Sequence, residues 1–154
     1  MTYPDVIKGS YSLTADRGRI DVEAVHAFLT RSFWASGISR ELVAKSIAHS
    51  LCFGVFDRQA QVAFARVVTD RATYAYLCDV YVLAAYRGKG LATWMMAFVM
   101  KHPDLQGLRR FQLVTRDAHA LYRPLGFTAP GHPERQMELF RPGLYSGQAT
   151  DEAS

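Results

Sequence analysis

Residues 77–96 read L-C-D-V-Y-V-L-A-A-Y-R-G-K-G-L-A-T-W-M-M, and the rest of the chain is organised around them. The first part, residues 77–83, is apolar except for Asp79 and is rich in the β-branched and aromatic residues that favour a strand. From Leu91 onward the apolar residues recur at helical spacing, at positions 91, 94, 95, 98 and 99. The stretch therefore predicts a buried strand, a sharp loop and an amphipathic helix with one buried face.

The loop between these two elements, R-G-K-G-L-A at residues 87–92, has the composition of an anion site. A strand that leads into a helix through glycines leaves several backbone N–H groups directed at one spot, at the positive end of the helix dipole. Gly88 and Gly90 have no Cβ, so a ligand can approach the backbone closely. A phosphate is the anion that these features favour.

Three phosphate-binding loops can be compared with this segment. A P-loop carries Lys and then Ser or Thr directly after its last glycine, but Gly90 is followed by Leu91. A dinucleotide fingerprint needs Gly or Ala where this chain has Thr93, and it belongs to a parallel βαβ unit. Residues 87–92 are similar, at every fixed position, to R/Q-x-x-G-x-G/A, the acyl-CoA loop of the GNAT N-acyltransferase superfamily.

A second motif carries the same resemblance. Residues 120–127, A-L-Y-R-P-L-G-F, are similar to the late A-x-x-Y-x-x-x-G-F segment of that superfamily. The resemblance extends over nearly the whole chain, from Tyr11 to Phe140, and it implies an α/β (α+β) fold. That fold is a mixed, largely antiparallel sheet flanked by helices, with the acyl-CoA site at the strand, glycine loop and helix.

The patterns along the chain predict the same order of elements. Turn residues between three apolar runs favour antiparallel pairing, and Asp21 and Ser39 are N-cap candidates for the first two helices. Residues 1–10 are expected to be a loose lead-in. The predicted strands are Tyr11–Thr14, Leu51–Phe56, Gln61–Thr69, Tyr74–Leu83, Leu108–Thr115 and Gln136–Phe140, and the predicted helices begin at Asp21, Ser39, Leu91 and Ala118.

Composition places limits on the class of protein. With 154 residues, 49% of them hydrophobic and 21% charged, the chain suits one soluble domain, with a core at 11–140 and a mobile tail at 141–154. The net charge of +4 suits an anionic ligand and is too small and scattered to indicate nucleic acid. No apolar run is long enough for a membrane span and no signal peptide is apparent, so a cytoplasmic protein with reduced Cys52 and Cys78 is expected.

The resemblance implies acetyl-CoA as the co-substrate, with no metal. The backbone amides of the glycine loop would hold its pyrophosphate, and the pantetheine arm would pair with the backbone at the end of the preceding strand. Asp117 stands about where many relatives carry an Asn that binds the pantetheine; as an ionised acid it can accept a hydrogen bond but not donate one. The implied cofactor-binding residues are Tyr81, Val82, Leu83, Arg87, Gly88, Lys89, Gly90, Leu91, Ala92 and Asp117.

Tyr122 sits where the resemblance places the acid that returns a proton to the departing thiolate. A phenol is protonated at neutral pH and is a sensible donor for this step. The alternative is a core tyrosine that packs its helix onto the sheet. Both interpretations are open at the level of the sequence.

Asp79 is the one acid in the central strand, and it is the candidate base or amine anchor. Arg66 has a similar position in the preceding strand; the turn between the two strands predicts Arg66 opposite Leu77 and diagonal to Asp79. The two charged side chains form either a structural ion pair or part of an acceptor site. If Asp79 is not the base that takes the amine's proton, a water molecule is the alternative. Phe33 and Trp34, in the loop between the first two helices, are candidates to line the acceptor pocket or to close the core.

These inferences predict an enzyme that transfers an acetyl group from acetyl-CoA to a primary amine of a small molecule or peptide, by direct attack in a ternary complex. The alternative is a sensor domain of the same fold that binds acyl-CoA or an amine without turnover. A homodimer is compatible with the sequence, and neither a nucleic acid nor a membrane partner is indicated.

Overall fold

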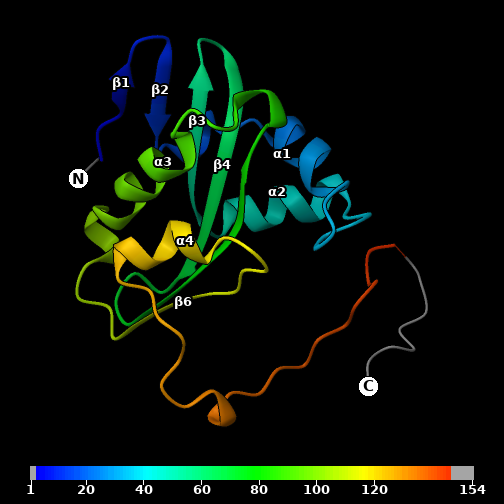
Figure 1. Cartoon of the computed structure of the whole chain (residues 1–154). Helices are drawn as coiled ribbons and strands as arrows, with labels where there is room; N and C mark the ends of the chain where they lie inside the picture. Colours follow the sequence, from blue (N-terminus) through cyan, green and yellow to red (C-terminus); the bar gives the residue numbers. More distant parts are fainter. Residues whose placement is uncertain (1–2, 147–154) are drawn as a thin grey trace.

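Six strands form one sheet in which every strand pairs with its neighbours in sequence, as the computed structural model shows for residues 3–146 (Figure 1). All neighbouring pairs are antiparallel except β5 and β6, which are parallel. The largely antiparallel sheet confirms the predicted fold class. The strands are β1 (Val6–Lys8), β2 (Tyr11–Thr14), β3 (Leu51–Asp57), β4 (Ala60–Thr69), β5 (Tyr74–Val82) and β6 (Arg110–Leu113).

The first two helices begin at the predicted caps. The Asp21 side chain accepts a hydrogen bond from the Ala24 N–H, and the Ser39 hydroxyl accepts one from the Leu42 N–H. The α-helices are α1 (Val22–Leu29), α2 (Arg40–Ala48), α3 (Leu91–Met100) and α4 (His119–Tyr122). Single 3₁₀ turns are η1 (Arg17–Arg19), η2 (Ala84–Tyr86), η3 (Pro103–Leu105), η4 (Arg123–Leu125) and η5 (Pro133–Arg135).

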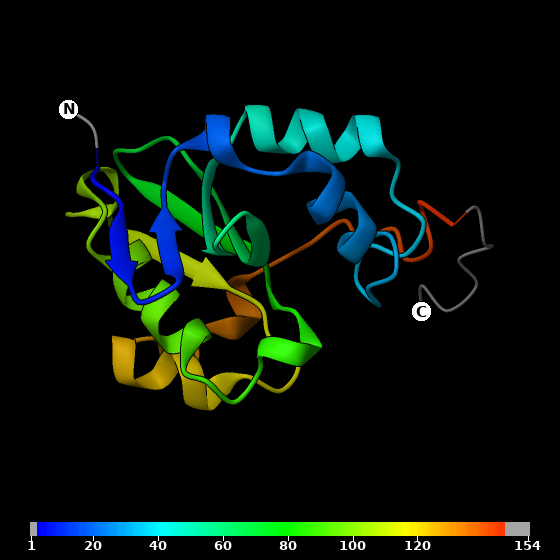
Figure 2. The same ribbon diagram turned by 90° about the horizontal axis from the view of Figure 1, so that it is seen from above.

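The helices cover the sheet on both faces, with α1 and α2 on one face and α3 and α4 on the other (Figure 2). Each face has its own apolar cluster. Under α3 and α4 the cluster includes Met95, Val99 and Tyr122, and under α1 and α2 it includes Val25 and Val43. The apolar positions of residues 91–99 are therefore the buried side of α3, as their spacing predicts.

The predicted register between β4 and β5 is wrong by one residue. Arg66 pairs with Cys78 rather than with Leu77, and the register shifts between Phe64 and Arg66. The shift is a β-bulge: β5 has one residue more than β4 over this interval, and Asp79 adopts a left-handed φ of 54°. The bulge lies beyond Arg66 from the turn, so the error at Arg66 arises in the turn itself. The pairs from Arg66 opposite Cys78 to Thr69 opposite Ala75 centre the turn on Ala72, half a residue later than predicted, and Arg71 in this turn has a left-handed φ of 65°.

The two ends of the chain also differ from the predictions. Part of the expected lead-in is a strand, β1, because Gly9 with a φ of 62° turns the chain back so that β1 pairs with β2. The predicted last strand at 136–140 does not form. Met137 and Leu139 are 97% and 75% exposed, because the chain has already left the sheet before η5 and this segment has no strand beside it among residues 3–146 (Figure 1).

The predicted tail begins at residue 141. Residues 142–146 form a turn, and residues 147–154 lie outside the described part of the chain, so the mobility of this segment stays a prediction. Within residues 3–146, no helix has the length and apolar character needed to cross a bilayer.

Candidate active site

The glycine loop after β5 has the backbone conformation that its two glycines predict. Gly88 and Gly90 have left-handed φ values of 76° and 78°, and a Cβ built on either would meet nothing within 4 Å. The Arg87 side chain folds back, and its Nε donates to the Val82 carbonyl at 3.0 Å. A ligand can therefore approach the backbone closely at both glycines.

From Gly88 onward, the N–H groups of this loop have no partner in the described part of the chain. The Arg87 N–H donates to Ala84 and the Trp94 N–H donates to Gly90, but no acceptor among residues 3–146 is recorded for the amides from Gly88 to Thr93. α1 and α2 begin at capping side chains, whereas α3 begins at Gly90, which has none. This run of free donors at a helix N-terminus can bind a phosphate group.

The edge of β5 that faces away from β4 has a neighbouring strand only along its first half. The parallel ladder with β6 runs from Tyr74 opposite Arg110 to Leu77 opposite Leu113, where β6 ends, while β5 continues to Val82. The strands separate at this point, as the resemblance implies. The backbone of β5 next to the glycine loop is free to pair with an extended, amide-containing ligand.

The side chains at the end of β5 face the two cores. Tyr81 packs in the cluster under α1 and α2 and stacks on Phe28 with ring centroids 3.8 Å apart. Val82 and Leu83 pack against the cluster under α3. The Leu83 N–H already donates to the Val62 carbonyl at 2.9 Å, and the Val82 carbonyl accepts the Arg87 bond, so the contact of these three residues with a pantetheine arm stays a prediction.

Tyr122 lies at the end of α4, on the face of the sheet that carries α3. It is 6% exposed and contacts Phe127 edge-to-face with ring centroids 6.0 Å apart. Burial raises the pKa of Tyr122 above its ordinary value, so the phenol holds its proton at neutral pH. No described residue makes a hydrogen bond to its hydroxyl, which leaves the proton available for a ligand.

Asp117 is exposed in the connection between β6 and α4. The Ala118 N–H donates to the Thr115 hydroxyl at 3.0 Å, so Thr115 and not Asp117 holds the start of α4. The neighbouring Arg116 places its guanidinium 3.9 Å from the centre of the Phe33 ring. This contact joins the β6–α4 connection to the α1–α2 loop, and the sequence contains no pattern that predicts it.

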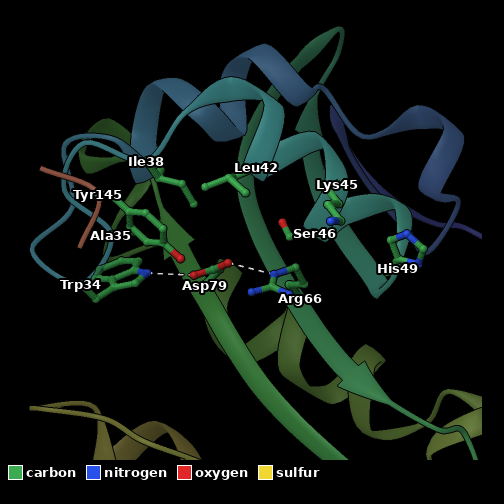
Figure 3. A pocket seen from close by; sticks show the side chains of 10 residues that line it. All are labelled: Trp34, Ala35, Ile38, Leu42, Lys45, Ser46, His49, Arg66, Asp79 and Tyr145. Atoms are coloured by element: carbon green, nitrogen blue, oxygen red, sulfur yellow. Dashed lines mark hydrogen bonds and ion pairs between the residues drawn. The ribbon is translucent and has the colours of Figure 1, made fainter. Parts of the chain in front are cut away.

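Asp79 lies at the β5 bulge on the face covered by α2. Its Oδ1 accepts a hydrogen bond from the Trp34 Nε1 at 2.9 Å, and its Oδ2 accepts one from the Arg66 Nε, also at 2.9 Å (Figure 3). Arg66 donates a second bond to the Ser50 hydroxyl at 3.1 Å. The Asp79 and Arg66 side chains are 11% and 18% exposed, so this is a largely buried ion pair.

A pocket of about 540 Å³ opens over this ion pair (Figure 3). Three of the residues predicted for the site, Trp34, Arg66 and Asp79, line it together. Phe33 does not line the pocket; it is 64% exposed and contacts Trp34 edge-to-face at 5.1 Å. No sequence pattern predicts the other lining residues, which are Ala35, Ile38, Leu42, Lys45, Ser46, His49 and Tyr145.

The candidate residues thus form two groups on opposite faces of the sheet. Tyr122 and the glycine loop lie with α3 and α4, and Asp79 and its pocket lie with α1 and α2. The opening between β5 and β6 begins at Cys78, next to Asp79. An extended ligand held by the loop could reach the pocket through this opening. Among residues 3–146, no three His, Cys, Asp or Glu side chains are grouped so that they could hold a metal ion.

Comparisons with known proteins agree with this geometry. The model of the acetyltransferase (GNAT) family matches residues 22–127, which include α1, the glycine loop and Tyr122. A crystal structure of a GNAT protein from Xanthomonas campestris pv. campestris, provisionally named an acetyltransferase, is 50% identical, with a TM-score of 0.86. The match covers 88% of this chain and 96% of that one.

Two further relatives extend the comparison. A protein of Gibberella zeae, provisionally named an acetyltransferase, is 28% identical over 138 residues, which cover 75% of this chain and 77% of the fungal protein. A Clostridium acetobutylicum protein, provisionally named an acetyltransferase and solved with acetyl-CoA, shares the fold at 17% identity with a TM-score of 0.61, over 84% of this chain and 94% of that one. The chain belongs to the GNAT family of acetyltransferases.

Proposed function

We propose that the chain transfers an acetyl group from acetyl-CoA to a primary amine by direct attack in a ternary complex. The observation that carries this proposal is the run of free backbone N–H groups from Gly88 to Thr93, next to the open edge of β5. A pyrophosphate bound at the loop would let the pantetheine arm pair with the backbone at Tyr81, Val82 and Leu83. The thioester would then lie in the opening between β5 and β6.

Tyr122 is our candidate for the general acid. The amine attacks the thioester carbonyl, the carbon–sulfur bond breaks, and the sulfur leaves as a thiolate that needs a proton. Tyr122 supports this role because it is protonated, buried and free of a recorded partner among the described residues. General-acid assistance of this kind contributes about a hundredfold to ten-thousandfold to the rate.

Asp79 is our candidate to bind and orient the amine. Each of its oxygens accepts one hydrogen bond, from Trp34 or Arg66, and a carboxylate oxygen has room for two. Each oxygen therefore keeps an acceptor site for an N–H of the amine. Either Asp79 or a water molecule then takes the proton that the attacking nitrogen must lose.

The experiment that tests the function is release of free thiol from acetyl-CoA in the presence of a panel of primary amines. Amine-dependent thiol release, together with the acetylated amine detected by mass spectrometry, is the expected result. Tyr122→Phe serves as the matched variant, since it retains the ring and its packing. Tight acetyl-CoA binding with no acetylated product from any amine would contradict the proposal and favour a sensor domain.

A further inference from the structure

The turn formed by residues 142–146 lies directly against the loop between α1 and α2. Gly37, in that loop, has a left-handed φ of 85°, and a Cβ built on it would lie 2.8 Å from the Tyr145 carbonyl oxygen and 3.1 Å from the Ser146 Cα. The Ser146 hydroxyl donates to the Gly143 carbonyl at 3.0 Å and closes the turn on itself. Two backbones that are distant in sequence thus meet at a contact that only glycine at position 37 allows.

This contact places the Tyr145 side chain in the pocket. Its ring lies near Ala35 and Ile38, and its hydroxyl end is directed toward Asp79 (Figure 3). Trp34, whose Nε1 donates to Asp79, lines the same part of the pocket. The carboxylate that would receive the amine therefore lies beside two aromatic rings, one from the α1–α2 loop and one from the C-terminal turn.

We propose that Tyr145 is a specificity-determining residue of the acceptor pocket and that it selects small primary amines. This inference rests on the proposed function. Trp34 presents its Nε1 and Tyr145 its hydroxyl end to Asp79, so the two rings narrow the access to this carboxylate, and the phenol oxygen can accept a hydrogen bond from an amine bound there. A pocket of about 540 Å³ with the turn as one wall has the size of a small-molecule site, and an extended polypeptide would contact the turn before its lysine reached Asp79.

The chain offers two sets of variants that separate this role from a general effect on folding. Tyr145→Ala removes the ring from the pocket, and Leu144→Ala removes a side chain of the same turn that does not line it. Gly37→Val displaces the turn, since its side chain would overlap the Tyr145 carbonyl. Gly107→Val is its control: Gly107 has a φ of 69° and nothing within 4 Å of a built Cβ.

The test measures thiol release from acetyl-CoA with benzylamine, spermidine, glucosamine 6-phosphate and a lysine-containing peptide as acceptors. For the small amine that the wild type uses best, we expect Tyr145→Ala and Gly37→Val to raise the KM on the order of tenfold. We expect the ratio of kcat/KM for the peptide to that for the small amine to rise. Leu144→Ala and Gly107→Val should behave as the wild type, and the acetyl-CoA affinity measured by calorimetry should be unchanged in all four.

Two results would overturn the role of Tyr145 in an active enzyme. One is an unchanged KM for small amines in Tyr145→Ala. The other is an equal gain in kcat/KM for small amines and the peptide, which would make the turn a simple obstruction. A wild-type protein that releases no thiol with any of the amines would instead overturn the proposed function itself, and this role with it.

Discussion

The Nε of Arg66 and the Oδ2 of Asp79 lie 2.9 Å apart, although in the ladder Arg66 pairs with Cys78. The contact exists because the extra residue of the β5 bulge, with Asp79 at a φ of 54°, turns the carboxylate onto the face that Arg66 occupies. The same carboxylate accepts the Trp34 Nε1 bond and lines the pocket under α2. One backbone irregularity thus creates both a buried ion pair and the polar centre of the candidate acceptor site.

The first prediction tests this ion pair. Asp79→Asn and Arg66→Gln should each lower the free energy of unfolding by about 3 kcal/mol, because each leaves a largely buried charge without its partner. The double variant should lose less than the sum of the two single losses. Urea unfolding of all four proteins measures this coupling.

The kinetics of the same variants test the role of Asp79 in the reaction. If Asp79 binds the amine, Asp79→Asn should raise the KM for the amine or lower kcat at a temperature where the variant is folded, and its acetyl-CoA affinity should stay near that of the wild type. Strong coupling in the unfolding experiment with wild-type kinetics would limit the pair to a structural role.

The second prediction concerns the glycine loop. Gly90→Val places a branched side chain where the phosphate would approach and strains a residue with a φ of 78°. It should abolish the rise in Tm that acetyl-CoA produces in the wild type by mass action. Gly107→Val carries a similar backbone strain in the connection between η3 and β6, so it should keep the ligand-induced shift despite a lower Tm. A normal shift in Gly90→Val would place the cofactor elsewhere.

The third prediction concerns Tyr122. Tyr122→Phe should lower kcat by about a hundredfold to ten-thousandfold, while the acetyl-CoA affinity changes far less, because the hydroxyl acts mainly in the transition state. The loss should shrink with a thioester whose leaving group needs no proton. Turnover near the wild-type value, with chemistry as the slow step, would leave Tyr122 as a core residue.

Burial of Tyr122 also sets a pH dependence. If Tyr122 is the general acid, its protonated form is the active one, and burial raises the pKa of Tyr122 above its ordinary value of 10.0. In the wild type, activity that depends on this acid should therefore be retained through neutral pH and be lost only above about pH 10. A profile of kcat against pH measures this loss of activity at high pH. The loss should be absent from the profile of Tyr122→Phe.

The fourth prediction concerns the two cysteines. Burial raises the pKa of both Cys52 and Cys78 to about 12, against the effect of the nearby Arg66 charge. At pH 8 only roughly one thiol in ten thousand would be ionised, so iodoacetamide should label neither residue in the folded protein and both in urea. Rapid labelling of the native protein would show that one of these thiols is accessible and ionised.

These thiols also affect stability at high pH. The unfolded chain loses its thiol protons near pH 9, while the folded chain holds them to about pH 12. The unfolded state therefore binds fewer protons over this range, and the free energy of unfolding should fall as the pH rises from about 9 towards 12. Cys52→Ala and Cys78→Ala should each reduce this slope.

Local patterns predicted most of the elements correctly. The helical spacing of residues 91–99, the caps at Asp21 and Ser39, and the turn segments between the strands of the meander lie within a few neighbouring residues, and each appears in the structure. The segment 136–140 has a strand-like composition too, but a strand also needs a partner strand, and the chain offers none beside it among residues 3–146.

The sequence by itself determined the family motifs and the strand–loop–helix unit with its two glycines, because each depends on residue type and short-range spacing; it offered an Asp79–Arg66 ion pair only as one of two alternatives. Only the tertiary structure decided the register at the bulge, the contact of Arg116 with Phe33 and the entry of Tyr145 into the pocket. These features join segments that are distant in the chain, and their geometry depends on how whole elements pack. No local pattern of residues carries that information.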